Sequence, residues 1–265
     1  MVAVDGGQVW ADDSGGDGPA LVLLHPGVGD SRIWEPVLAP LTAKYRVLRY
    51  DARGFGRSPA PGAEFSLLRD LIAVLDHFGA ARAAFVGCSQ GGASSLGLAL
   101  AQPERVSALV LLCPGIPGFP MTDEEEAAMI GADRAAEIEA DYGRAQAAGD
   151  VDALAAVVRR IWGAAGDAPA VMEQSRSAAR ASIAGADLEL DDPPVFDRLS
   201  EITVPAALMV GDADYPPLVE ANRQAAARIP ACEFEFVPGM DHFPPLREPG
   251  LVLDLVTRTL GRANW

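Results

Sequence analysis

The chain has 265 residues, of which 49% are hydrophobic, and a formal net charge of -16 at pH 7. This length is enough to bury one large core, and no apolar run approaches the roughly 18 residues of a membrane span, so a soluble globular protein is expected. The negative charge argues against nucleic acid and anionic membranes as partners, because phosphate groups are bound by clustered Lys and Arg.

Short apolar runs rich in β-forming residues alternate with helical patterns along the chain, which predicts a mostly parallel sheet covered by helices. The helical spacing of apolar residues is clearest over residues 67–78 and residues 93–100. The predicted strands are Ala20–His25, Arg46–Tyr50, Ala83–Cys88, Ala108–Cys113, Ala206–Val210 and Glu233–Val237.

An acidic, alanine-rich insert interrupts this rhythm after Cys113 and runs to about Ser200, before the strand pattern resumes. Its first helix is predicted to begin at Thr122, because Thr122-Asp123-Glu124-Glu125 matches a capping box with carboxylates near the positive end of the helix dipole. Asp191-Asp192-Pro193-Pro194 is typical of a linker that returns the chain to the sheet. The insert therefore predicts a separate helical lobe.

The stretch Phe85-Val86-Gly87-Cys88-Ser89-Gln90-Gly91-Gly92 joins a predicted strand to a predicted helix. Gly87 and Gly91 allow the backbone to turn sharply around Ser89, which leaves its hydroxyl exposed beyond the end of the strand. The N-terminus of the next helix offers N–H groups to a developing oxyanion. Ser89 is therefore the candidate nucleophile, and the alternative is a small residue in a glycine-rich turn.

A serine hydroxyl needs a base to take its proton, and the chain contains three histidines. His77 lies at the end of an amphipathic helix pattern and is expected to be structural. His25 ends a predicted strand and opens a Pro-Gly turn. His242 follows the last predicted strand, and loops at the carboxyl ends of strands in a doubly wound sheet gather at one rim. His242 is therefore the candidate base.

An acid that orients His242 is expected after another strand. Asp212 and Asp214 both follow the strand before it, and Asp214 is preferred because a residue further into the turn better reaches the neighbouring loop. The strand that precedes the insert is followed by proline and glycine, so it supplies no acid there. Asp241 adjoins His242 in sequence, and we expect it to cap its own loop.

With Ser89, Asp214 and His242 in this chain order, the sequence resembles the serine-nucleophile branch of the α/β-hydrolase superfamily over nearly its whole length. The resemblance implies an α/β fold, with a mostly parallel eight-stranded sheet flanked by helices and a helical cap inserted after strand 6. It divides the chain into a hydrolase core over residues 1–115 and 201–265 and a cap over residues 116–200.

The sequence LLHPGVGDSRIW resembles the family's histidine-glycine oxyanion loop, in which the residue two past the histidine supplies an N–H. That residue is Gly27 here, with Val28 as a substitute, although Pro26 stands where the family usually has glycine. Gln90, next to the nucleophile, would supply the second N–H. The stretch Tyr50–Ser58 resembles the family's Asp-x-Arg-Gly-x-Gly-x-Ser turn, to which we assign a structural role.

The resemblance implies a capped esterase or lactonase that forms an acyl-enzyme on a small to medium, mostly apolar substrate. Carbon-carbon bond hydrolases, perhydrolases, lyases and cyclases of the superfamily use the same triad, and fold analogy does not choose among them. A ligand receptor on this fold and an enzyme that uses His242 alone as a base are further alternatives. Packing within the cap is the favoured interpretation for Trp162, although it also belongs to the candidate pocket residues, which are Ile116, Phe119, Met121, Trp162 and Phe243.

The three cysteines, Cys88, Cys113 and Cys232, are scattered and odd in number, which argues against a disulfide framework and suits the cytoplasm. The N-terminus lacks the basic and apolar regions of a secretory signal. No metal-ligand spacing is present, so neither a metal nor a cofactor is predicted. The expected partner is a small-molecule substrate, bound by a monomer or homodimer, and Cys88 is expected to pack beneath the nucleophile.

Overall fold

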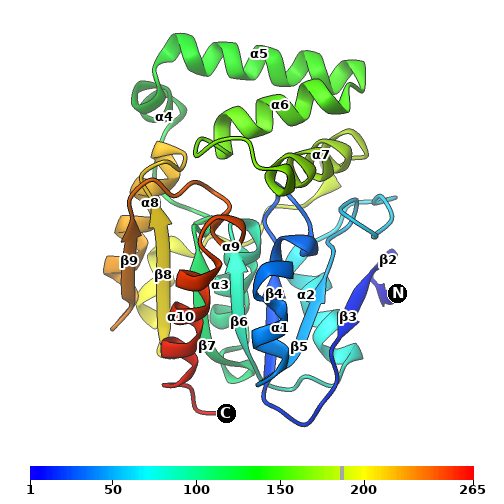
Figure 1. Cartoon of the computed structure of the whole chain (residues 1–265), viewed down its shortest axis with the longest axis vertical. Coiled ribbons are helices and arrows are strands. Elements are labelled where there is room, and N and C mark those ends of the chain that lie inside the picture. The colour runs from blue at the N-terminus through cyan, green and yellow to red at the C-terminus, as the bar shows by residue number, and fades with distance from the viewer. Residues whose placement is uncertain (186–187) are drawn as a thin grey trace.

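The computed structural model describes residues 1–185 and 188–265, and seven strands of this part of the chain form one large sheet. The strand order is β3-β5-β4-β6-β7-β8-β9 (Figure 1). β3 is antiparallel to β5, and every other neighbouring pair is parallel. The strands are β3 (Ala11–Asp13), β4 (Ala20–Leu24), β5 (Arg46–Tyr50), β6 (Ala83–Cys88), β7 (Val106–Leu112), β8 (Ala206–Gly211) and β9 (Glu233–Val237).

Helices cover both faces of the sheet. α1 and α10 pack against each other on one face, and α2, α3 and α8 lie on the other (Figure 1). These helices and the short elements near them are α1 (Glu35–Thr42), α2 (Leu67–His77), α3 (Gln90–Ala101), α8 (Pro216–Arg228), α9 (Pro244–Arg247) and α10 (Pro249–Leu260), with 3-10 helices η1 (Ser31–Trp34), η2 (Pro103–Arg105) and η4 (Phe196–Glu201).

The three central strands carry the core. Every residue of β6, β7 and β8 is buried, because helices cover both sides of a parallel sheet and leave no face in water. Such strands appear in sequence as continuous apolar runs, which is why their positions were readily predicted. The ordering of these strands places the ends of β6 and β8 on either side of β7.

The insert between β7 and β8 forms helices that lie beyond the carboxyl ends of the strands (Figure 1). The predicted capping box is confirmed, because Thr122 accepts from the N–H of Glu125 and the Glu125 carboxylate accepts from the N–H of Thr122. No helix within the described ranges combines the length and apolarity needed to cross a bilayer. The helices of the insert are α4 (Asp123–Ile130), α5 (Ala132–Ala148), α6 (Val151–Trp162) and α7 (Pro169–Ile183).

The large sheet has one strand fewer than the eight that were expected, counted over the described residues. Two N-terminal strands, β1 (Val2–Val4) and β2 (Gly7–Val9), pair with each other in a separate antiparallel hairpin. This hairpin turns at Gly6, which has a φ of 66°, and β1 packs against α2 instead of extending the sheet. We call α4–α7 and their connections the cap; its status as a separate domain stays a prediction.

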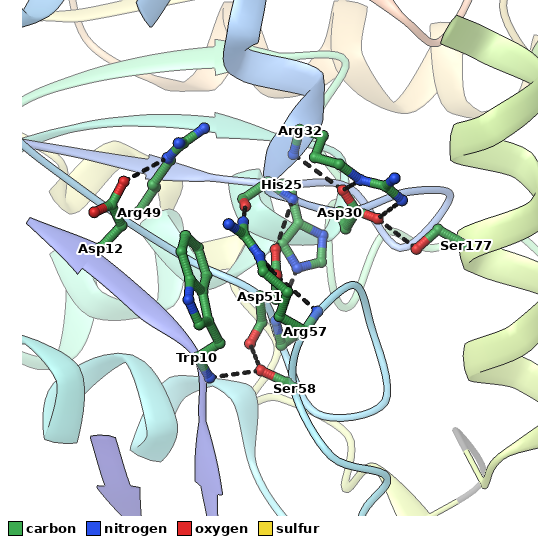
Figure 2. A network of polar contacts seen from close by, with 12 residues as sticks. Trp10, Asp12, His25, Asp30, Arg32, Arg49, Asp51, Arg57, Ser58 and Ser177 are labelled. Carbon is green, nitrogen blue, oxygen red and sulfur yellow. Dashed lines mark hydrogen bonds and ion pairs between the residues drawn. The ribbon is translucent and has the colours of Figure 1, made fainter. Parts of the chain in front are cut away.

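The turn Tyr50–Ser58 is held by polar contacts that agree with the structural role predicted for it (Figure 2). Asp51 is fully buried, and its carboxylate accepts from the N–H of Ser31 and from both the N–H and Nε of Arg57. The Arg57 guanidinium stacks over the Trp10 ring, 3.0 Å from its centroid. These contacts join the start of η1 to the turn after β5, next to the loop after β4.

Candidate active site

Ser89 occupies the sharp turn between β6 and α3 that the sequence predicts. Its backbone has φ 49° and ψ -114°, a conformation that L-residues rarely adopt and that costs on the order of 1–3 kcal/mol. A Cβ at Gly87 would collide with the backbone of Gly91, and one at Gly91 would collide with the carbonyl of Leu24. The turn is held by the Ser89 N–H, which donates to Leu112 O at 3.0 Å. Glycine on both sides therefore permits the tight approach that presents Ser89.

His242 and Asp214 meet as predicted. His242 lies in the loop between β9 and α9, and its Nδ1 is 2.9 Å and 3.0 Å from the two carboxylate oxygens of Asp214. Both side chains have no exposed surface. A carboxylate only accepts, so Nδ1 carries the proton and Nε2 has a free lone pair. Nε2 is buried and has no hydrogen-bond partner among the described residues, so Ser89 Oγ does not bond it in this conformation.

The other acids near His242 have separate partners. Asp212 is exposed and accepts from the N–H of Gly239 at 2.6 Å. Asp241 is fully buried, accepts from the N–H of Phe243 in its own loop at 3.2 Å, and also binds Arg247 and the N–H of Ala165 in the cap. The geometry thus resolves the choice between Asp212 and Asp214 as the partner of His242, and the expected loop-capping position of Asp241 is confirmed.

The remaining histidines lie apart from this pair. His77 is exposed at the last turn of α2. His25 is buried behind the candidate oxyanion loop, where its Nδ1 lies 2.8 Å from Pro26 O and its Nε2 accepts from the N–H of Ala52 at 2.9 Å. Both ring nitrogens of His25 are therefore engaged, and neither is free to act as a base.

The two candidate oxyanion residues lie in contact. A Cβ placed on Gly27 would be 3.4 Å from Oε1 of the Gln90 side chain, so this side chain packs beside the Gly27 backbone. Gln90 is the first residue of α3, where a helix leaves its N–H groups without internal partners. The N–H groups of Gly27, Val28 and Gln90 make no hydrogen bond to any described residue. They are therefore free to bind an anionic oxygen.

The cap closes directly over the histidine. The Trp162 ring packs on the His242 imidazole with ring centroids 4.4 Å apart, and the backbone carbonyl of Trp162 accepts from the N–H of His242 at 3.1 Å. The ring also packs against Tyr215, which follows Asp214. Trp162 is therefore a contact of His242 as well as a residue of the cap.

The other four candidate pocket residues differ in burial. Ile116 is buried beside the end of β7, Phe243 is fully buried, and Met121 is half-buried. Phe119 packs edge-on against Phe196, with ring centroids 5.1 Å apart. Contact with a substrate stays a prediction for these four.

Two thiols lie beneath the site. Cys88 and Cys113 are buried with their sulfur atoms 3.8 Å apart, and both approach His242 O. Burial holds the pKa of the Cys113 thiol well above its usual range. Donor atoms of Cys113, Asp214 and His242 lie within 4.8 Å of one another, and they are the one group of metal-binding residue types in the described ranges. Since the carboxylate already accepts from the imidazole, we interpret this group as a hydrogen-bonded pair with a thiol behind it.

Glu189 is a site neighbour that the sequence did not single out. Its carboxylate accepts two hydrogen bonds from Nε2 of Gln90, at 2.8 Å and 3.0 Å. Burial, reinforced by the nearby charges of Asp192 and Asp191 and opposed by the Gln90 hydrogen bonds, raises the pKa of Glu189 to about 7. Nothing in its local pattern distinguishes it from the many other acids of the insert.

Substituting Glu189 with glutamine should flatten the dependence of stability on pH. The Glu189 carboxyl loses its proton near pH 7 in the folded chain and near the ordinary value of 4.5 in the unfolded chain. Between these two pH values the folded state therefore binds more protons than the unfolded state, so the free energy of unfolding falls as pH rises. We expect wild type to lose about 3 kcal/mol more than Glu189→Gln between pH 4.5 and 8. Urea unfolding at both pH values measures this, with exposed Glu124→Gln as control; equal losses in all three proteins would contradict it.

Comparison with known proteins gives a family match over most of the chain. Residues 21–255 match the model of the family described as "Alpha/beta hydrolase family". RutD of Caulobacter segnis, named for carbamate hydrolysis, is 38% identical over 101 residues, which make up 36% of this chain and 38% of that protein. The chain thus spans well under half the length of this relative.

Solved structures match over nearly the whole chain. The enol-lactonase from Burkholderia xenovorans LB400 has a TM-score of 0.78 and 23% identity, covering 98% of this chain and 100% of that one. Est816, described as an N-acyl homoserine lactone degrading enzyme, has a TM-score of 0.71 and 28% identity, covering 97% and 98% of the two chains. These structures share the fold described above.

Proposed function

Because this chain belongs to the alpha/beta hydrolase family, we propose that it is a serine hydrolase that cleaves a carboxylic ester or lactone through an acyl-enzyme intermediate. The observation that carries the proposal is the buried Asp214–His242 pair, whose free Nε2 lies at the same rim of the sheet as the strained turn at Ser89. The family match alone supports hydrolysis, and this pair supports the serine-dependent form of it.

In the proposed reaction, Ser89 Oγ forms a bond to the substrate carbonyl carbon while its proton passes to His242 Nε2. The carbonyl electrons move to oxygen, and the N–H groups of Gly27 and Gln90 stabilise the resulting oxyanion. The intermediate collapses, and the leaving alkoxide takes the proton from His242. Water then attacks the acyl group with the same base, which releases the acid and restores Ser89.

We propose a neutral, mostly apolar substrate of small to medium size. A cavity of about 470 Å³ beside Gln90 is lined in part by Glu189, Asp191 and Asp192, and those of the three side chains that are ionised would repel an anionic substrate. The likeness to Est816 supports including lactones among the test compounds, and the partial match to RutD supports including carbamates.

Fluorophosphonate labelling tests this function. We expect wild-type protein to gain one adduct, mapped by mass spectrometry to Ser89, and His242→Ala to gain none, because the unassisted hydroxyl is a weak nucleophile. His77→Ala, which changes an exposed histidine, is the matched control and should label like wild type. A folded wild-type sample without any adduct would contradict the proposal. Multiple turnovers of p-nitrophenyl esters then separate an enzyme from a ligand receptor.

A further inference from the structure

One helix of the cap makes buried polar contacts with the loop that carries Gly27. Gln174 and Ser177, both on α7, are each 3% exposed. Gln174 Oε1 accepts from the N–H of Asp30 at 2.7 Å, and Ser177 Oγ donates to Asp30 Oδ2 at 2.6 Å. Figure 2 shows Ser177 reaching Asp30 from the helix beside the loop. These contacts join parts of the chain far apart in sequence.

The loop before Asp30 is a tight turn that is held at both ends. The N–H of Gly29 donates to Pro26 O at 3.2 Å, which closes a turn with Gly27 and Val28 in the middle. His25 Nδ1 bonds Pro26 O at one end of the turn. At the other end Gln174 packs so closely that a Cβ on Gly29 would overlap its amide. The position of the candidate donor N–H groups is therefore fixed between β4 and α7.

Asp30, the residue that Gln174 and Ser177 contact, stays ionised near neutral pH. Asp30 is fully buried, and burial alone would raise its pKa, but hydrogen bonds from Arg32 and Ser177 outweigh burial and hold the pKa below its usual range. The Asp30 carboxylate also accepts from the N–H of Arg32 and so caps η1. A single ionised side chain thus binds α7, η1 and the end of the oxyanion loop together.

We propose that Gln174 and Ser177 are positioning residues, which hold the turn of residues 26–29 so that its N–H groups face the oxyanion only while α7 is seated on the core. This inference rests on the proposed function, because it assigns the turn to an oxyanion hole. A misplacement of about 1 Å in a catalytic group can cost roughly 100-fold in rate. The cap would therefore contribute to turnover as well as to substrate enclosure.

Gln174→Met, which keeps the side-chain length and removes the acceptor of the Asp30 N–H, tests the inference. We expect kcat for p-nitrophenyl butyrate to fall about 10- to 100-fold while KM stays within about threefold, because the lost interaction acts in the transition state. Amide hydrogen exchange over residues 27–30 should also become faster. Gln146→Met is the matched control, since Gln146 bonds Ser182 within the cap and does not contact the oxyanion loop.

The inference is overturned if folded Gln174→Met shows wild-type exchange over residues 27–30, or if exchange rises while kcat of an active enzyme is unchanged. If wild type neither labels at Ser89 nor hydrolyses esters, the proposed function fails instead. The exchange experiment then still shows whether α7 fixes the loop, but the assignment of Gln174 to catalysis falls with that function. Ser177→Ala, which removes one hydroxyl, replaces Gln174→Met if the latter does not fold.

Discussion

Replacing Ser89 with alanine should lower kcat for a hydrolysed ester by about 10⁴-fold or more, because the acyl-enzyme cannot form without its oxygen. The fold should be unchanged, since Ser89 Oγ makes no hydrogen bond to His242 and alanine has the same backbone preferences at this strained turn. Steady-state hydrolysis of p-nitrophenyl butyrate by freshly purified protein measures the loss, and circular dichroism confirms the fold.

The Ser89→Ala result also separates the remaining reaction classes. An enzyme that uses His242 alone as a base would keep most of its activity in this variant. A carbon-carbon bond hydrolase or perhydrolase that needs the serine would lose its activity in this variant, as an esterase would. These classes are therefore distinguished from esterases by the substrates they accept. Full activity in a folded Ser89→Ala protein would exclude the acyl-enzyme mechanism.

Asp214→Asn should reduce kcat/KM by about 10³- to 10⁴-fold. The asparagine amide can donate to Nδ1, which favours the imidazole tautomer that carries its proton on Nε2, where the base needs a free lone pair. It also removes the charge that stabilises the imidazolium. The measurement is kcat/KM for the same ester between pH 6 and 9, because a change of tautomer should lower activity throughout this range.

Asp212→Asn is the matched control for this variant. Asp212 follows the same strand, but it is exposed and bonds Gly239 instead of His242, so the substitution should leave kcat/KM within about twofold of wild type. Equal losses in the two variants would show that the effect comes from the loop as a whole. A small loss in Asp214→Asn alone would contradict its assignment as the orienting acid.

The sequence predicted those parts of the molecule that depend on local pattern. The bounds of β5, β6 and β9 agree with prediction, because short runs of β-forming residues between turn residues mark strands independently of their partners. The turn at Ser89 was found because its glycines are needed by the backbone itself. Asp214 was preferred over Asp212 from its place in the turn, and the hydrogen bond to His242 agrees with that choice.

Features that depend on long-range contacts could not be predicted. β1, β2 and β3 have three residues each, too few to show an alternating pattern. The β1–β2 pair depends on a glycine turn and on packing against α2, and β3 depends on pairing with β5. Gln174 and Glu189 carry no local signal, because their importance comes from Asp30 and Gln90, which are distant in sequence. The closure of Trp162 over His242 likewise depends on how the cap rests on the core.

The order β7-β8-β9 at one edge of the sheet has a consequence for how the protein is made. The strands β3 to β7 precede the cap in the chain and form one continuous part of the sheet. The turn at Ser89 and the two strands beside β6 are therefore translated before the cap. β8 then joins the open edge of β7, β9 joins β8, and the loops after these two strands carry Asp214 and His242. Under the proposed function, we therefore expect Ser89 to stay inactive during synthesis until β8 and β9 dock, because the candidate acid and base are translated after it.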